Sequence, residues 1–171
     1  MWRYGVLAIL VSAATHLAFN RPSAQSILEK SKSGETTSVR TGDPDMSAAM
    51  RKARATLPEF LTLARSPKPG QSGFALKIGV PFTEKDTEYL WINPFEAKGG
   101  GVFVGRVNNT PVSVKNIKHG QMIEFDESNV ADWTYRENGK MKGNHTACAL
   151  LKRDTPANRE AFRKEYGLEC D

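Results

Sequence analysis

The chain has 171 residues, of which 39% are hydrophobic, and 24 lysines and arginines against 19 acidic residues give a formal charge of +5. This length is enough for one domain with a core of its own. Because charges of both signs are mixed along the chain, the composition favours an ordinary solvated surface over the clustered cationic face of a nucleic-acid-binding protein.

The N-terminal segment has the organisation of a secretory signal peptide. Arg3 precedes an apolar run from Tyr4 to Phe19, and no acidic residue occurs before Glu29. This pattern predicts residues 1–24 as a signal cleaved after Ala24, with earlier cleavage after Ala14 or Ala18 as the alternatives. We therefore expect a periplasmic or secreted protein.

A retained membrane anchor is the alternative for the same segment. A span needs roughly 20 apolar residues in succession, and His16 and Asn20 interrupt this run. We expect no stable membrane span after cleavage. Cleavage removes Arg3 and Arg21 but no acidic residue, so it lowers the formal charge of the chain from +5 to +3.

The next elements are a linker and a helical region. Residues 25–45 are almost wholly polar, which predicts a disordered linker. Asp45 is expected to cap a helix over residues 46–55. The segment Thr56-Leu57-Pro58-Glu59 resembles a capping box with proline in the first turn, so a second helix, to Arg65, should follow a kink.

Alternating apolar residues then indicate strands. Residues 74–82 have an apolar side chain at every second position, and Thr87 to Phe95 form the next expected strand, with Tyr89, Trp91 and Phe95 on one face. Glycine- or asparagine-rich turns separate two further strands over residues 102–107 and 121–125.

The last part of the chain predicts a hairpin and a helix. Residues 130–136 should pair with residues 140–151 across Asn138-Gly139, a type I′ turn signal. Thr155-Pro156 opens a final helix that ends at Gly167, with Phe162 and Tyr166 toward the sheet. The expected fold is a single α+β domain over residues 46–171, with a mainly antiparallel sheet of about six strands, a kinked N-terminal helix and a C-terminal helix.

The chain has two cysteines, Cys148 and Cys170. In an oxidising compartment they can form a disulfide. The alternative is a buried Cys148 and a free Cys170 near the chain end.

Aromatic residues on the expected strands suggest a binding surface. Asp132 and Trp133, with Tyr135 and Trp91, could form an aromatic platform with one acceptor. The alternative is that both tryptophans are core anchors and that Asp132 binds a nearby backbone N–H group.

Two other groups of polar residues allow chemistry. His145 could act as the general base of a small hydrolase, with Asp132 or Glu88 as the acid that orients it. Because no nucleophile motif accompanies His145, the sequence favours the alternative of a strand histidine that faces solvent. Lys140 and Lys142, with Asn144, could bind an anion, or could protect an edge strand from aggregation.

Metal and cofactor motifs are missing from the sequence. His119 and His145 are too far apart in sequence to give a ligand-spacing signature, and Gly99–Gly101 lack the strand-to-helix context of a phosphate-binding loop. We expect neither a metal nor a cofactor.

Several short motifs occur in a fixed order along the chain. They are Ala53-Arg54, Thr56-Leu57-Pro58, Trp91, Gly105, Asn108, Asp132-Trp133, Gly139-Lys140, Gly143 and Thr146. Over about Met46 to Leu151, this order resembles the bacterial YegJ-like family of domains of unknown function. Glu88-Tyr89 departs from the family, where a histidine is frequent. The resemblance implies no activity, but it adds Asn108, in the central turn, to the predicted binding residues.

Two functions remain. The first is a non-enzymatic binding module of the cell envelope, which includes inhibitors that cover the active site of a toxin or an envelope enzyme; its partner is an unknown protein or envelope component. The second is the small hydrolase. The hydrolase requires an acidic side chain within hydrogen-bond reach of His145, whereas the binding module predicts an exposed aromatic patch around Trp91, Trp133 or Tyr135.

Overall fold

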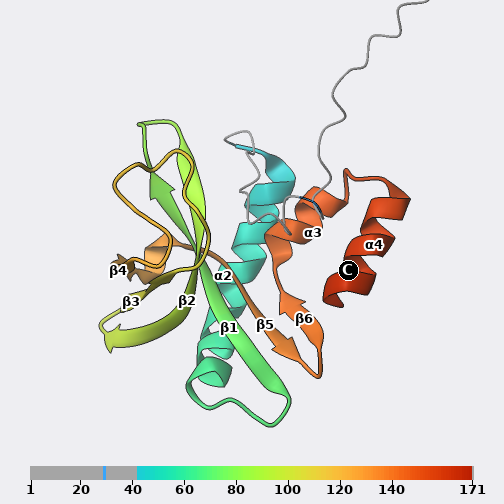
Figure 1. Cartoon of the computed structure of the whole chain (residues 1–171), viewed down its shortest axis with the longest axis horizontal. Coiled ribbons are helices and arrows are strands. Elements are labelled where there is room, and N and C mark those ends of the chain that lie inside the picture. Colours follow the sequence, from blue (N-terminus) through green and yellow to red (C-terminus); the bar gives the residue numbers. More distant parts are fainter. Residues whose placement is uncertain (1–28, 30–41, 171) are drawn as a thin grey trace, which may run out of the picture.

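The structure, a computed structural model, describes Glu29 and residues 42–170. In this part of the chain, six antiparallel strands form one sheet in the order β4-β3-β2-β1-β5-β6, which one long helix crosses, and two shorter helices lie beside β6 (Figure 1). This confirms the predicted α+β class. The predicted signal over residues 1–24 and most of the predicted linker lie outside the described residues.

The elements follow in chain order. They are α2 (Pro44–Arg65), β1 (Gln71–Pro81), β2 (Thr87–Gly99), β3 (Val102–Val107), β4 (Met122–Asp126), a 3-10 turn (Glu127–Asn129), β5 (Val130–Glu137), β6 (Lys140–Gly143), α3 (His145–Leu151) and α4 (Pro156–Tyr166). Among the described residues, no helix has the length and apolar character needed to cross a membrane.

Helix α2 corrects the prediction of two helices. Asp43, not Asp45, caps it, because its Oδ1 accepts the Met46 N–H at 3.0 Å, and the helix continues through Pro58. The last residues of the predicted linker are therefore helical. Pro58 removes one backbone hydrogen bond, but Leu57 and Phe60 on either side of it are buried against the sheet. The stability gained by packing this face of α2 on the sheet outweighs the cost of the hydrogen bond lost at Pro58.

The sheet core lies between α2 and the central strands. It contains aliphatic side chains from β1 and β2 and a group of stacked aromatic rings, with Phe60 at 5.0 Å from Trp133 and Phe74 at 5.0 Å from Tyr135. The buried members of this cluster are Leu57, Phe60, Leu76, Ile78, Leu90, Ile92, Phe103, Val107, Phe125, Val130 and Tyr135.

Strand β2 does not place its aromatic residues on one face as predicted. Its register against β3 shifts between Ile92 and Phe95, so Phe95 reaches the core and lies 6.1 Å from Phe60. Trp91 lies between the buried residues Leu90 and Ile92 and therefore points to the opposite face. An extra residue in one strand changes which side chains share a face.

The hairpin is shorter than predicted. Asn138 and Gly139 have φ values of 50° and 80°, in agreement with a type I′ turn, but β6 ends at Gly143. Gly143 and Asn144 then adopt left-handed conformations, with φ values of 73° and 52°, and the chain continues as α3. His145 is therefore a helical residue, and the prediction of a strand to residue 151 is wrong.

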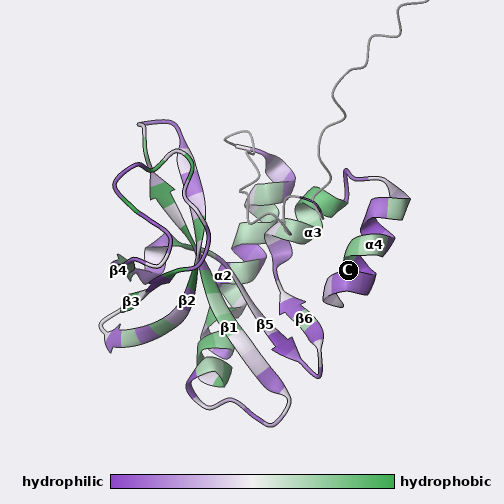
Figure 2. Cartoon of the chain, in the orientation of Figure 1, coloured by the Kyte–Doolittle hydropathy of each residue, from purple (hydrophilic) through white to green (hydrophobic). Residues whose placement is uncertain are grey.

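The final helix begins and ends as predicted and packs against α3 and the β6 edge of the sheet. The Thr155 hydroxyl accepts the Asn158 N–H at 3.1 Å, and Gly167 ends α4 in the left-handed region. Phe162 and Tyr166 lie in one cluster with apolar residues of α3 and with Met141 of β6. We call Ala147, Leu151, Phe162 and Leu168 the C-terminal cluster. In Figure 2, α3 is mostly hydrophobic, whereas β6 is hydrophilic.

Candidate functional site

Asp132 is the polar centre of the junction between the sheet and α3. Its Oδ1 accepts the N–H groups of Trp133 at 2.9 Å and His145 at 3.2 Å. Its Oδ2 accepts the Thr146 N–H at 2.7 Å and the Thr146 hydroxyl at 2.6 Å. The side chain is 0% exposed. Asp132 therefore holds the start of α3 and does not face solvent.

Lys77 completes this junction. Its Nζ donates to Thr146 Oγ1 at 2.6 Å and lies 4.5 Å from the centroid of the Trp91 ring. Burial lowers the pKa of the Lys77 ammonium, and the charge of Asp132 opposes that shift. The sequence analysis missed Lys77, because it meets Asp132 only across paired strands β1 and β5.

A lysine beside a hydroxyl can activate that hydroxyl as a nucleophile. Here Thr146 is 2% exposed, and its hydroxyl donates to Asp132. The pocket described below does not include Thr146. The chain of hydrogen bonds from Lys77 through Thr146 to Asp132 is therefore a structural link between sheet and helix.

The predicted aromatic platform is not formed. Trp133 Nε1 donates to the Ala53 carbonyl of α2 at 3.0 Å, and Tyr135 is 8% exposed in the sheet core. Trp91 lies on the other face of the sheet, over Lys77. These aromatic side chains act mainly as anchors between elements.

Glu88 and the asparagines of the central turn organise a different part of the molecule. The Glu88 carboxylate accepts three consecutive N–H groups, of residues 112–114, at 2.7 to 2.8 Å. Asn109 Oδ1 accepts the Trp91 N–H at 2.7 Å, and the exposed Asn108 donates its N–H to the Trp91 carbonyl at 2.8 Å. Glu88 is thus committed to the loop before β4.

His145 is consequently not arranged as the hydrolase prediction requires. Its hydrogen bond to Asp132 uses the backbone N–H, and its imidazole stands edge-on to Trp133 with ring centroids 5.4 Å apart. His145 instead lines a pocket.

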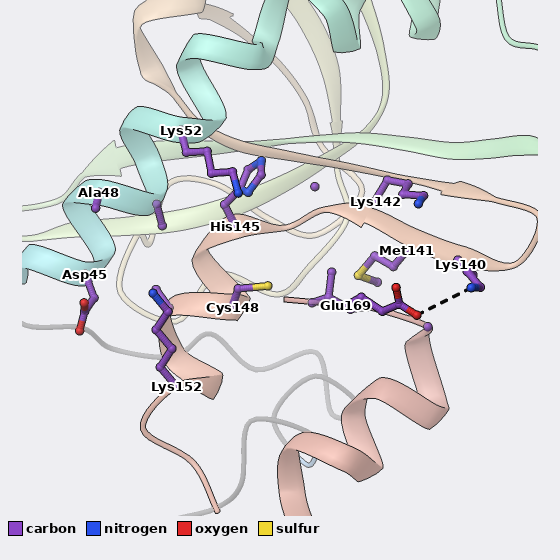
Figure 3. A pocket seen from close by; sticks show the side chains of 15 residues that line it. Asp45, Ala48, Lys52, Lys140, Met141, Lys142, His145, Cys148, Lys152 and Glu169 are labelled. Carbon is purple, nitrogen blue, oxygen red and sulfur yellow. Dashed lines mark ion pairs between the residues drawn. The ribbon is translucent and has the colours of Figure 1, made fainter. Parts of the chain in front are cut away.

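This pocket, of about 390 Å³, lies between the N-terminal half of α2, β6, α3 and the residues that follow α4 (Figure 3). In Figure 3, Lys52 extends from α2 toward His145, and Lys152, the residue after α3, extends toward α2. The charged residues and the histidine that line the pocket are Asp45, Lys52, Lys140, Lys142, His145, Lys152 and Glu169.

Both acidic residues of the pocket have a cationic partner. Lys140 Nζ lies 3.7 Å from Glu169, and Arg153, which does not line the pocket, lies 2.6 Å from Asp45. The side chains around the pocket therefore carry an excess of positive charge.

Two glycines allow β6 to lie close to its neighbours. A Cβ at Gly143 would clash with the Trp133 carbonyl oxygen of β5, and one at Gly167 would lie 3.0 Å from Lys140 Cα. Both glycines also have positive φ values. The close contact between β6 and the C-terminal segment depends on Gly167, and that between β6 and β5 depends on Gly143.

The pocket contains only part of the predicted site. It brings together Lys140 and Lys142, both predicted as anion-binding residues, with His145. Sequence reasoning missed Lys52 and Lys152, since each looks like an ordinary exposed residue on its own helix. The pocket does not include Trp91, Asn108, Asp132, Trp133 or Tyr135, whose role in binding stays a prediction.

Cys148 lines the pocket and forms a disulfide with Cys170, with 5.4 Å between their Cα atoms. Of the two alternatives left open by the sequence, the structure has the bridged form. The bond attaches the segment after α4 to α3, next to the pocket wall formed by Leu168 and Glu169.

Comparison with known proteins gives a family but no activity. The model of the family described as "Uncharacterized protein conserved in bacteria (DUF2314)" matches residues 43–170. The chain is also 30% identical to "Uncharacterized protein YegJ" of Escherichia coli (strain K12) over 107 residues, which cover 62% of this chain and 67% of that protein. No solved structure matches the chain significantly.

Proposed function

The chain belongs to the DUF2314 family of bacterial proteins, whose description names no activity, and from the pocket we propose that it is a non-enzymatic binding module of the cell envelope. The module binds a ligand or partner through an anionic group. The observation that carries this proposal is the convergence on one pocket of lysines from α2, from β6 and from the residue after α3.

The convergence is more informative than the number of lysines. Lysines that only solvate a surface are spread over it, whereas these come from positions as far apart as Lys52 and Lys152 and border the same concavity. Mutual repulsion of like charges disfavours such a cluster. A bound anion would relieve that repulsion.

The hydrolase is less well supported. Both candidate acidic partners of His145 are engaged elsewhere, Asp132 with the start of α3 and Glu88 with the loop before β4. A general base needs an orienting group and a reactive group in reach. The pocket's two acids, Asp45 and Glu169, are in ion pairs.

Two features support a location in the envelope. The N-terminal segment has the composition of a signal peptide. The disulfide between Cys148 and Cys170 is typical of oxidising compartments. A partner protein that presents an anionic group to the pocket fits the same function, including a toxin or envelope enzyme whose active site the module would cover.

A thermal-shift screen of the full chain against a panel of soluble anions tests this proposal. We expect at least one anion to raise the Tm of the wild type but not that of a Lys142→Gln, Lys152→Gln double variant. The matched control is Lys98→Gln with Lys118→Gln, which removes the same charge at exposed positions outside the pocket.

Three results would contradict the proposal. The first is that no anion raises the Tm of the wild type, and the second is that an anion still raises the Tm of the Lys142→Gln, Lys152→Gln variant. The third is that the protein hydrolyses the stabilising compound and that His145→Ala abolishes the hydrolysis. The last result would establish the hydrolase instead.

A further inference from the structure

We propose that the anionic group bound in the pocket is a phosphomonoester. This inference rests on the proposed binding function and names its ligand class. It comes from the charge balance, the type of donor and the size of the pocket.

The charge balance calls for about two negative charges. Of the pocket's charged side chains, Lys140 is paired with Glu169, and Asp45 is paired with Arg153, so Lys142 and Lys152 supply about two positive charges. A phosphomonoester carries about −1.5 to −2 near neutral pH and has three strong acceptor oxygens. A single carboxylate supplies only one charge and leaves part of the excess uncompensated.

The donors also suit a phosphate. A lysine ammonium is a compact charge with three donors, so several of them can contact the oxygens of a tetrahedral phosphate from different sides. Lysines from α2, from β6 and from the residue after α3 surround the pocket in this way.

The pocket is sized for a small organic phosphate. Its volume of about 390 Å³ is near the lower end of the roughly 300 to 1,000 Å³ found for small-molecule sites. Its four lysines are exposed and so can be reached from solvent. Uncharged side chains available to the organic part are Ala48, Ala49, Met141 and Leu168.

The same phosphate chemistry has two sources, a soluble molecule or the headgroup of a lipid. Isothermal titration calorimetry of the full chain with glycerol 3-phosphate tests the soluble source, with glycerol and succinate as controls for the alcohol and for a dicarboxylate. Co-sedimentation with phosphatidylcholine vesicles, with and without phosphatidic acid, tests the lipid source.

We expect binding of glycerol 3-phosphate or of phosphatidic acid vesicles, and no binding of glycerol. The Lys142→Gln, Lys152→Gln variant should weaken binding by about tenfold for each lysine, which corresponds to about 1.4 kcal/mol each, because each substitution removes a charge that contacts the phosphate. The Lys98→Gln, Lys118→Gln control, checked with the pocket variant for native circular dichroism, should bind like the wild type.

The inference is overturned if succinate binds as tightly as the phosphate probes, or if neither phosphate probe binds. It is also overturned if the pocket variant binds them like the wild type. The thermal-shift screen separates these failures from failure of the binding function: if other anions still stabilise the wild type through Lys142 and Lys152, the binding module stands and only the phosphate class is wrong.

Discussion

The molecule has two hydrophobic clusters held by different means. The sheet core contains eleven buried residues, including stacked aromatic rings, whereas the C-terminal cluster contains four. Because so small a cluster buries little apolar surface, the C-terminal region depends on polar and covalent links. The Asp132 network and the pair between Arg153 and Asp43 link it to the rest, and the disulfide holds α3 and the segment after α4 together within it.

The pocket lies where the two regions meet. One wall belongs to α2, which is anchored in the sheet core, and another belongs to Leu168 and Glu169, which follow α4. The links between the regions therefore determine the shape of the pocket. Changes to the sheet core should unfold the whole protein, and changes to the links should loosen the C-terminal region alone.

The largest expected effect comes from the sheet core. Phe60→Ala should lower the free energy of unfolding by about 4 kcal/mol, because it removes a buried ring and leaves a cavity among its aromatic neighbours. Chemical denaturation with tryptophan fluorescence measures the loss. Phe162→Ala in the C-terminal cluster is the comparison, and an equal loss of global stability there would contradict the division into two regions.

Loss of the disulfide should act on the C-terminal region. Its 22-residue separation corresponds to about 3 kcal/mol in the chain-entropy estimate. For Cys148→Ser with Cys170→Ser we expect faster amide hydrogen exchange in α4, with exchange in β1 and β2 unchanged. Faster exchange throughout the sheet would show that the two regions unfold together.

The Asp132 network should have a smaller but detectable effect. Asp132→Asn keeps the shape of the side chain but removes the negative charge that faces Lys77. It also replaces one carboxylate oxygen with an NH₂ group, which cannot accept the hydrogen bonds that groups such as the Thr146 N–H now donate. The expected loss is about 2 kcal/mol, measured by denaturation. Unchanged stability would mean that the network contributes nothing to the junction.

The smallest effect concerns pH. The Arg153 guanidinium, together with the Met46 N–H, lowers the pKa of Asp43 from 3.8 to about 2. Because the folded pKa is lowered, the stabilisation is present above pH 3.8 and is lost as the pH falls toward 2. Asp43→Ala should therefore lower the Tm much more at pH 7 than at pH 2, and a constant difference at both pH values would contradict this assignment.

The elements that the sequence predicted well are those fixed by neighbouring residues. The Asn138-Gly139 turn and the final helix, from its Thr155 cap to Gly167, depend on the conformations of a few adjacent residues. The alternation of apolar residues in β1 likewise reports burial against α2 directly. In these cases local preference and tertiary packing agree.

The errors occurred where distant contacts decide. Helix α3 is stabilised by Asp132, which lies 14 residues from Thr146 and caps the helix across the sheet, so the strand pattern before it misled the prediction. Helix α2 continues through Pro58 because its neighbours pack on the sheet. No local pattern in the sequence indicated either contact.

The pocket was predictable only in part for the same reason. Lys140 and Lys142 are close in sequence and were recognised together as an anion-binding possibility. Lys52 and Lys152 join them only because α2 packs against α3 and β5, and β5 pairs with β6. The disulfide partners could be named from the sequence, but only the folded arrangement places Cys148 at the pocket wall.

The most direct test of the binding site is an NMR titration of the ¹⁵N-labelled protein with glycerol 3-phosphate, which reports where an anion binds. We expect the largest backbone shift changes around Lys52, Lys142, His145 and Lys152, where α2, β6 and α3 border the pocket. Shift changes centred on Trp91 and Asn108, or no saturable changes, would contradict the assignment of this pocket as the binding site.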